Sequence, residues 1–394
     1  MKNFTYSSPT KIHFGNEQIV KLNDELNIYR GKTILLVYGM GSIKRNGIFD
    51  KIVQEANNLN IKIIEENNVS SNPDISSVRS GIKKCIEHNV EFILAAGGGS
   101  VIDCAKAIAF GIYAPSDVWD VYLRKADATK ALPLGVIITL AATGTETNGN
   151  SVISNRELDD KRSVAYPFSI PQFAIIDPSY TLTVNRHHTI AGSMDVILHI
   201  LEQYFSNTLR TETSDYMSIG VIKSVIENTN RILEGDNSYD NRSNISWAST
   251  IGLNWILGVD KQGDWATHRL SYALTKEYGT THGFALVLIY TSWMRVALKY
   301  NPETMSRKLN LLGLNLFQTS SPESTIESFE RLFNGFGANT NFKDEKIVMD
   351  ESKMNDLIEN VLALGEIGTV VKIDKIKAKE IFVLARGGKH GNLL

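Results

Sequence analysis

The sequence has few cysteines, no long apolar run and almost no net charge. Only Cys85 and Cys104 occur among 394 residues, and neither belongs to a CxxC pair, so a thiolate metal cluster and a disulfide framework are excluded. No apolar stretch approaches the roughly 20 residues that span a bilayer, and the N-terminal segment has no apolar region typical of a signal peptide. A formal net charge of −2 gives no reason to expect nucleic acid or a membrane surface as partner. We therefore expect a cytoplasmic globular protein.

The first half of the chain alternates short β-branched runs with helical stretches. A helix is predicted from Asp74 to about residue 89, and another from 101 to 110. The strands are predicted at residues 32–38, 61–64, 92–96, 134–138 and 173–176. Strands and helices that alternate at this spacing predict an α/β domain, a Rossmann-like parallel sheet with helices on both faces.

The pattern changes after residue 178, where apolar residues recur at helical spacing. Ser321 and Pro322 predict the start of one helix, and Gly335 and Gly337 predict its end. A chain of 394 residues is long enough for two domains. We therefore predict a dinucleotide-binding α/β domain over residues 1–182 and an all-helical metal-binding and substrate domain over residues 183–394.

Two polar segments follow predicted strands and are candidates for binding a cofactor. Gly98, Gly99 and Ser100 lie between a strand and a helix, where free backbone N–H groups suit a pyrophosphate. A tight turn without a ligand is the alternative. Thr139 and Thr143 lie at the end of the next strand and suit a ring and a ribose, although a plain polar loop has the same composition.

The loop after the first predicted strand bears on the choice of cofactor. Dinucleotide folds that prefer NAD usually place an acid there to bind the ribose 2′-hydroxyl. The segment from Gly39 to Arg45 has no acid and carries Ser42, Lys44 and Arg45 instead. This composition favours the 2′-phosphate of NADP(H).

Four residues are candidate metal ligands. Asp195 and His199 are four apart in a predicted helix, which places both side chains on one face. His268 and His282 lie further along the chain. One carboxylate and three imidazoles suit Fe²⁺ or Zn²⁺. A single histidine is more often a hydrogen-bonded core or surface residue, so spacing alone leaves this site open.

Several ordered motifs together resemble the iron-containing (group III) alcohol dehydrogenases, and within them the butanol dehydrogenase and aldehyde reductase branch. The resemblance runs from about residue 4 to the mid-300s. The tail at 386–392 matches none of the motifs. The motifs are PTKIHFG at 9–15, YGMGS at 38–42, AGGGSVID at 96–103, ATGTE at 142–146, IDP at 176–178, GxxDxxxHxxE at 192–202, DWATH at 264–268 and THG at 281–283.

This resemblance implies a fold, an activity and a set of site residues. The fold is that shared with dehydroquinate synthase, and the activity is hydride transfer between NADP(H) and a small primary alcohol or aldehyde. The metal ligands implied are Asp195, His199, His268 and His282. The residues implied to contact the cofactor are Gly39, Gly41, Ser42, Asn72, Gly98, Gly99, Ser100, Asp103, Thr139, Leu140, Thr143, Lys161 and Leu182. Members of this branch are usually homodimers joined partly through their N-terminal strands.

One position departs from the family pattern. Tyr272 lies where the family usually has a second histidine near the nicotinamide and the substrate. A tyrosine can donate a proton, but its unperturbed pKa is near 10, against about 6.5 for histidine. Tyr272 is therefore a candidate proton donor or simply a residue that fills the pocket.

Three alternatives to an alcohol dehydrogenase stay open on this fold. A dehydroquinate synthase-like lyase needs several basic residues for a phosphorylated substrate, and only Lys261 and Arg269 lie near the proposed ligands in sequence. A glycerol dehydrogenase-like polyol oxidoreductase and a non-catalytic cofactor-binding protein are the others.

Overall fold

The computed structural model describes residues 1–363 and 365–387, so the end of the C-terminal tail at 388–394 lies outside the described residues. The chain forms two compact units. The sheet unit consists of Ser7–Val184 and Asn237–Asn254, and the helical unit of Met1–Tyr6, Asn185–Asp236 and Trp255–Leu394. No described helix is long and apolar enough to cross a membrane.

The sheet unit contains a six-stranded sheet in which every neighbouring pair is parallel. Its order is β1-β8-β5-β4-β2-β3. The strands are β1 (Lys11–Phe14), β2 (Thr33–Tyr38), β3 (Lys62–Glu66), β4 (Phe92–Gly97), β5 (Leu134–Ile138) and β8 (Phe173–Ile176). The five strands expected from apolar runs are therefore present and the predicted α/β class is confirmed, whereas β1 at the sheet edge was not among the strands predicted from apolar runs.

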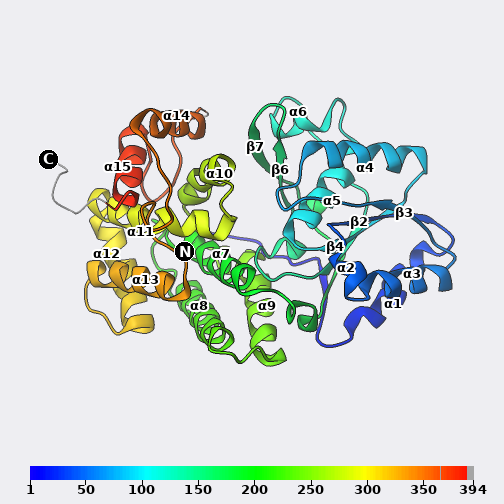
Figure 1. The fold of residues 1–394 in the computed structure, drawn as a ribbon, viewed down its shortest axis with the longest axis horizontal. Helices are drawn as coiled ribbons and strands as arrows, with labels where there is room; N and C mark the ends of the chain where they lie inside the picture. Colours follow the sequence, from blue (N-terminus) through cyan, green and yellow to red (C-terminus); the bar gives the residue numbers. More distant parts are fainter. Residues whose placement is uncertain (364, 388–394) are drawn as a thin grey trace. The chain divides into compact units, whose positions relative to one another are not determined.

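Helices cover both faces of this sheet because its strands are apolar on both sides. Leu35 and Val37 of β2 pack into one core with α4 (Ile75–Glu87), α5 (Gly99–Gly111) and α6 (Val118–Tyr122). Ile34 and Leu36 of the same strand pack into a second core with α1 (Leu22–Leu26) and α3 (Ile48–Asn58). Figure 1 shows α4 and α3 on opposite sides of β2 and β3. The alternation of successive side chains along a strand produces this sandwich.

A separate antiparallel hairpin follows β5, formed by β6 (Asn150–Asn155) and β7 (Asp160–Ala165). The sequence did not predict it, because polar residues dominate both strands. Lys106 of α5 holds its first strand: the fully buried ammonium donates to the carbonyl oxygens of Thr145 at 2.6 Å and Asn150 at 2.9 Å. Burial lowers the pKa of Lys106 to about 8.

Helix α9 (Tyr239–Leu253) belongs to the sheet unit, although it lies in the half of the sequence expected to be all-helical. The hydroxyl of Thr250 donates to Glu146 at 2.6 Å, and the amide of Asn148 donates to the carbonyl oxygen of Leu253 at 3.1 Å. These long-range polar contacts tie the helix to the segment that follows β5. A boundary drawn at residue 182 therefore differs from the observed division at residues 1–6, 183–184 and 237–254.

The helical unit is built around two long buried helices, α7 (Arg186–Tyr204) and α11 (His282–Tyr300). Helix α13 (Pro322–Phe336) begins and ends as predicted, since Ser321 and Ser324 form a capping box and Gly337 adopts φ 91° after its last residue. The others are α8 (Glu212–Leu233), α10 (Ala266–Tyr278), α12 (Pro302–Leu312), α14 (Glu351–Val361) and α15 (Lys375–Ala385).

Short elements complete the chain. Helix α2 (Ser42–Arg45) follows β2. The 3₁₀ turns are η1 (Gln18–Lys21), η2 (Asn27–Tyr29), η3 (Thr145–Thr147), η4 (Pro167–Ser169) and η5 (Pro178–Thr181), and η6 (Gly313–Phe317) is a π-helical turn.

Candidate metal centre and cofactor loops

Three polar side chains form a stripe along the buried helix α7. Asp195, His199 and Glu202 are four and then three residues apart, so they lie on one helix face. Their exposed fractions are 4%, 7% and 0%. Burying one carboxylate without partners costs several kcal/mol, on the order of the whole stability margin of a domain, so such a stripe requires compensating partners.

Those partners come from helices α10 and α11. His268 lies in the first turn of α10, and His282 is the first residue of α11. Helix α11 approaches α7 closely at Gly283, where a Cβ atom would lie 2.1 Å from the carbonyl oxygen of Ala191. Glycine is therefore required beside His282, because any side chain would push the two helices apart.

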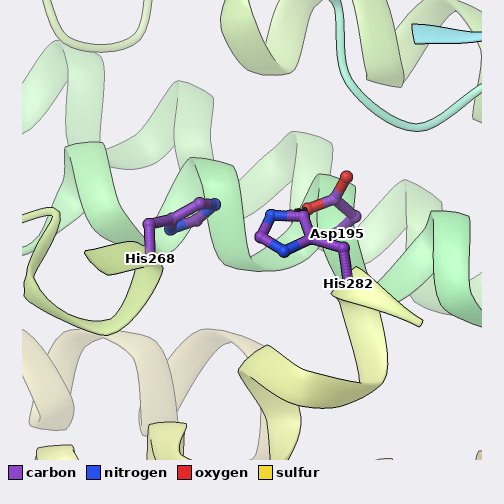
Figure 2. A group of neighbouring side chains, drawn as sticks. All are labelled: Asp195, His268 and His282. Atoms are coloured by element: carbon purple, nitrogen blue, oxygen red, sulfur yellow. Dashed lines mark ion pairs between the residues drawn. The ribbon is translucent and has the colours of Figure 1, made fainter. Parts of the chain in front are cut away.

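Asp195, His268 and His282 converge on one point (Figure 2). One ligand atom of each lies within 4.8 Å of the others. The Nε2 of His282 is 3.7 Å from the Oδ1 of Asp195. Ligand bonds of about 2.1 Å in a tetrahedral site place ligand atoms about 3.4 Å apart, so this spacing suits a single small divalent ion.

The protonation state of His268 also suits a metal ligand. Burial lowers the pKa of His268 to about 3, so its imidazole is neutral. Its Nε2 is buried and has no hydrogen-bond partner among residues 1–363 and 365–387. A neutral imidazole with one nitrogen left for another ligand is the form that binds metals.

His199, the fourth predicted ligand, adjoins this group but lies outside the three-residue cluster. Its Nδ1 is 3.5 Å from the Oδ1 of Asp195. Its ring stacks on that of His268, with the centroids 4.6 Å apart. The structure thus brings all four predicted residues together, and the set of four ligands stays a prediction.

Glu202 makes the contacts that sequence reasoning missed. Its Oε2 accepts from the backbone N–H of Trp265 at 2.7 Å, and its Oε1 lies 2.9 Å from the Nδ1 of His268. The hydroxyl of Thr267 also donates to Oε1. Burial raises the pKa of Glu202, and these donors act against that rise. Its spacing from Asp195 and His199 was the available signal.

Aromatic rings flank the histidines on two sides. Trp265 adopts φ 64°, a backbone conformation unusual for a bulky residue, and its ring lies edge-on to His268 with the centroids 5.2 Å apart. The ring of Tyr272 lies 5.7 Å from that of His282, whose side chain is 27% exposed. Tyr272 is therefore next to the accessible side of the cluster.

In the sheet unit, the two predicted cofactor loops contact each other. Gly98 caps α5, and a Cβ atom there would lie 3.4 Å from the Cβ of Leu140. A Cβ atom on Gly99 would lie 2.6 Å from the Oγ1 of Thr143. The N-terminus of α5 therefore faces the segment that begins at Thr139, and glycine is required for this close approach. Ser100 donates its hydroxyl hydrogen bond to the carbonyl oxygen of Ser71.

Lys161 and Asn72 also come together, across a separation of 89 residues. The ammonium of Lys161 donates to the Oδ1 of Asn72 at 3.1 Å. Leu182 is the C-cap that follows η5, and its carbonyl oxygen accepts from the side chain of Asn237 at 2.9 Å. Both arrangements leave the predicted cofactor roles of these residues as predictions.

Asp103, another predicted cofactor contact, makes hydrogen bonds within the sheet unit. Its carboxylate accepts from the hydroxyl of Thr145 at 2.7 Å and from the backbone N–H of Val152 at 3.0 Å. Burial raises the pKa of Asp103. These contacts join α5 to η3 and β6.

The loop after β2 presents one cation beside its glycines. Gly41 adopts φ 92°, and the Arg45 guanidinium lies 3.7 Å from the position of a Cβ atom on Gly41. Lys44 is already engaged, because its ammonium is 3.6 Å from the carboxylate of Glu65 and 4.3 Å from the ring centre of Phe49. Two basic residues were expected to meet a 2′-phosphate. Of these, only Arg45 is exposed and has no ion pair within the described residues.

The basic residues near the proposed metal ligands do not support the lyase alternative. The side chain of Lys261 is fully buried, and its ammonium is 2.7 Å from the carboxylate of Asp215. Asp215 also binds the buried Lys308 at 2.5 Å. Lys261 is therefore committed to a structural ion pair, which leaves Arg269 as the only one of the two that is exposed.

Comparison with known families agrees with this geometry. Residues 9–178 match the profile described as "Iron-containing alcohol dehydrogenase". Residues 189–385 match that described as "Fe-containing alcohol dehydrogenase family, C-terminal". The chain belongs to the iron-containing alcohol dehydrogenase family.

Similar proteins carry names of both cofactor types. A probable NADH-dependent butanol dehydrogenase of Bacillus subtilis is 37% identical over 383 residues, which cover 95% of this chain and 97% of that protein. An NADPH-dependent aldehyde reductase of Escherichia coli is 32% identical over 292 residues, covering 73% and 74%. The crystal structure of an NADH-dependent butanol dehydrogenase from Thermotoga maritima has a TM-score of 0.92 and 33% identity, covering 98% of this chain and 99% of that one.

The predicted family and the oxidoreductase class of this iron-containing alcohol dehydrogenase are thereby confirmed. The family combines a metal with NAD(P). The helical unit accordingly has a cluster of residues that could bind a metal, and the sheet unit has glycine-rich loops. The expected preference for NADP(H) does not follow from the family, because relatives named for NADH and for NADPH are both similar to the chain.

Proposed function

We propose that this protein interconverts a small primary alcohol and its aldehyde with NADP(H), using one divalent metal, Fe²⁺ or Zn²⁺. The observation that carries the proposal is the convergence of the buried Asp195 and His268 with the partly exposed His282, within 4.8 Å, in a member of this family. Relatives named butanol dehydrogenase and aldehyde reductase support the substrate class.

The residues of the helical unit suit one ion with a residual positive charge. Asp195, His199, His268 and His282 would hold it, and one carboxylate with three neutral imidazoles leaves a divalent site at about +1. Such a metal would polarise the oxygen of the substrate, and a bound nicotinamide would exchange a hydride with the carbon that carries this oxygen. The chain itself supplies the ligand geometry, and the rings of Trp265 and Tyr272 border it.

The direct test is oxidation of NADPH and NADH with a panel of short aldehydes. The protein is first stripped of metal with a chelator and then assayed with and without added Fe²⁺ or Zn²⁺. We expect reduction of at least one primary aldehyde that depends on the added metal. Full activity of the stripped protein, or no turnover of any aldehyde with either metal, would contradict the proposal. Phosphate release from a sugar phosphate without net NADPH consumption would instead favour the lyase.

The preference for NADP(H) rests on the loop after β2. The chain has Gly39 where an acid would hold the ribose 2′-hydroxyl, and Glu65 on the neighbouring strand is engaged with Lys44 and the hydroxyl of Tyr38. We expect Arg45→Ala to raise KM for NADPH about tenfold, since a charge-assisted phosphate contact contributes roughly 1.5–3 kcal/mol before screening at this exposed position. KM for NADH should change little.

The matched control for Arg45 is Lys44→Ala. Because Lys44 is paired with Glu65, its removal should affect KM for NADPH less than removal of Arg45. Steady-state kinetics with both cofactors measure this difference. A wild-type protein with equal or better kcat/KM for NADH, or an Arg45→Ala protein that loses both cofactors equally, would rule out a 2′-phosphate role.

Tyr272 is proposed to help deliver the proton that the alkoxide product needs. Its ring lies beside His282 on the accessible side of the cluster. We expect Tyr272→Phe to lower kcat about tenfold, below the roughly 10²–10⁴-fold typical of a sole acid, because water or a ribose hydroxyl can substitute. Metal content should stay the same, and Tyr272→His should restore turnover. An unchanged kcat in Tyr272→Phe would mean that the ring only fills the pocket.

We also propose that the protein is a homodimer that associates partly through its N-terminal strand. Strand β1 lies at one edge of the sheet and is hydrogen-bonded to β8. Exposed backbone groups of an edge strand can pair with a second copy. Light scattering coupled to size-exclusion chromatography should give twice the mass of one chain, and a monomer mass would exclude this assembly.

A further inference from the structure

We propose that Glu202 is a positioning residue that keeps His268 in the tautomer protonated at Nδ1, so that the lone pair of Nε2 faces the metal. The inference rests on the proposed metal site and adds a residue to it. The Oε1 of Glu202 lies 2.9 Å from the Nδ1 of His268. Carboxylates that bind the second nitrogen of a ligating imidazole fix its orientation and raise its basicity.

The tautomer follows from what else surrounds Glu202. Its Oε1 accepts from the hydroxyl of Thr267 and from the backbone N–H of His268 at 3.2 Å, and its Oε2 accepts from the backbone N–H of Trp265. A carboxylate that already accepts hydrogen bonds from three donors also acts as an acceptor towards the imidazole beside it. The Nδ1 of His268 is therefore the nitrogen that carries hydrogen.

The same carboxylate also places the imidazole. Trp265 is the N-cap of α10, and Thr267 and His268 lie in its first turn, where backbone N–H groups have no partner within the helix. Glu202 binds two of these N–H groups, and the partial positive charge of the helix N-terminus favours an acid there. Because both the backbone and the ring of His268 bind one fully buried carboxylate, the ring has little freedom to rotate.

The free end of the ring points to the other ligands. Figure 2 shows a ring nitrogen of His268 directed towards Asp195 and His282. Its Nε2 is buried with no hydrogen-bond partner in the described part of the chain. The arrangement therefore has a donor nitrogen on the Glu202 side and an acceptor nitrogen on the metal side.

Asp264 offers a matched comparison, because it is a second buried carboxylate next to α10. Its Oδ2 accepts from the backbone N–H groups of Thr369 at 2.8 Å and Val370 at 2.7 Å, and its Oδ1 accepts from Ala266 at 3.1 Å. None of these recorded contacts involves an imidazole. Burial and the nearby charge of Glu202 raise the pKa of Asp264. Replacing Asp264 therefore perturbs the charge and stability of the same region, while the hydrogen bond between Glu202 and His268 keeps both of its partners.

The experiment compares Glu202→Gln with Asp264→Asn. Each metal-stripped protein is titrated with Zn²⁺ against a competing chelator, and circular dichroism checks the fold. We expect Glu202→Gln to bind Zn²⁺ about 10–100-fold more weakly than wild type, the usual effect of losing such a partner, and Asp264→Asn to change affinity less than threefold, a difference of about 0.6 kcal/mol. Wild-type affinity in Glu202→Gln, or an equal loss in Asp264→Asn, would overturn the proposal.

A second measurement needs no variant. In metal-free wild-type protein labelled with ¹⁵N-histidine, long-range ¹H–¹⁵N spectra should show His268 protonated at Nδ1. The opposite tautomer would overturn the role of Glu202 even if the variants fail to fold. A wild-type protein that binds neither Zn²⁺ nor Fe²⁺ overturns both this inference and the proposed function, whereas tight, catalytically competent binding with an unaffected Glu202→Gln overturns this inference alone.

Discussion

Replacing His268 by alanine should remove the metal and the aldehyde reductase activity together. His268 is the most buried of the three proposed histidine ligands, and its loss leaves a cavity beside the carboxylates of Asp195 and Glu202. Uncompensated buried charge and a missing ligand both weaken the site. We expect kcat/KM to fall at least about 10³-fold, which corresponds to roughly 4 kcal/mol of transition-state stabilisation.

The measurement pairs elemental analysis of metal per chain with NADPH-linked reduction of the best aldehyde. His88→Ala is the control, since His88 is an exposed residue at the end of α4 and should leave both quantities unchanged. If His268→Ala keeps a full equivalent of metal and normal turnover, the cluster on α7, α10 and α11 is not the catalytic centre.

A single methyl group at Gly283 should be nearly as damaging, although it adds no charge. A Cβ atom there would lie 2.1 Å from the carbonyl oxygen of Ala191 and 2.9 Å from its carbon, both of which are backbone atoms. Backbone cannot move aside as a flexible side chain can, so α11 must shift relative to α7. We expect Gly283→Ala to lower the free energy of unfolding by about 3 kcal/mol or more.

This shift should also reach the metal, because His282 precedes Gly283 in the first turn of α11. Metal affinity should therefore drop with stability. Gly335→Ala is the matched control: Gly335 lies in helix α13, and a Cβ atom there meets no other heavy atom within 4 Å. That change should be neutral or stabilise the protein by up to about 1 kcal/mol. Urea unfolding and metal analysis would compare the two, and equal stabilities would show that α7 and α11 tolerate separation.

The sequence predicted the strands and helix ends that depend on neighbouring residues. Residues 92–96 and 134–138 are continuous apolar runs, and such runs form buried parallel strands. The capping residues of α13 predicted its ends for the same reason. The hairpin β6–β7 escaped prediction because polar side chains hide its alternation, and only long-range contacts such as that of Lys106 with Asn150 identify it.

The candidate site divides in the same way. Asp195 and His199 could be paired from their spacing, because four residues make about one helical turn. His268 and His282 are 73 and 87 residues from Asp195, and their convergence depends on how three helices pack. The resemblance to a known family supplied that convergence in advance, but not the contact of Glu202 with His268 or the close approach at Gly283.

By itself, the sequence determined the helices and strands whose apolar residues recur at regular spacing along the chain. Its ordered motifs also determined the family and the class of chemistry. Tertiary structure alone decided that Lys44 is engaged while Arg45 stays exposed, and that α9 joins the sheet unit. It also decided that one buried carboxylate holds His268. The physical reason is that hydrogen bonds, ion pairs and steric contacts act over a few ångströms in space, and folding alone sets which distant residues come that close.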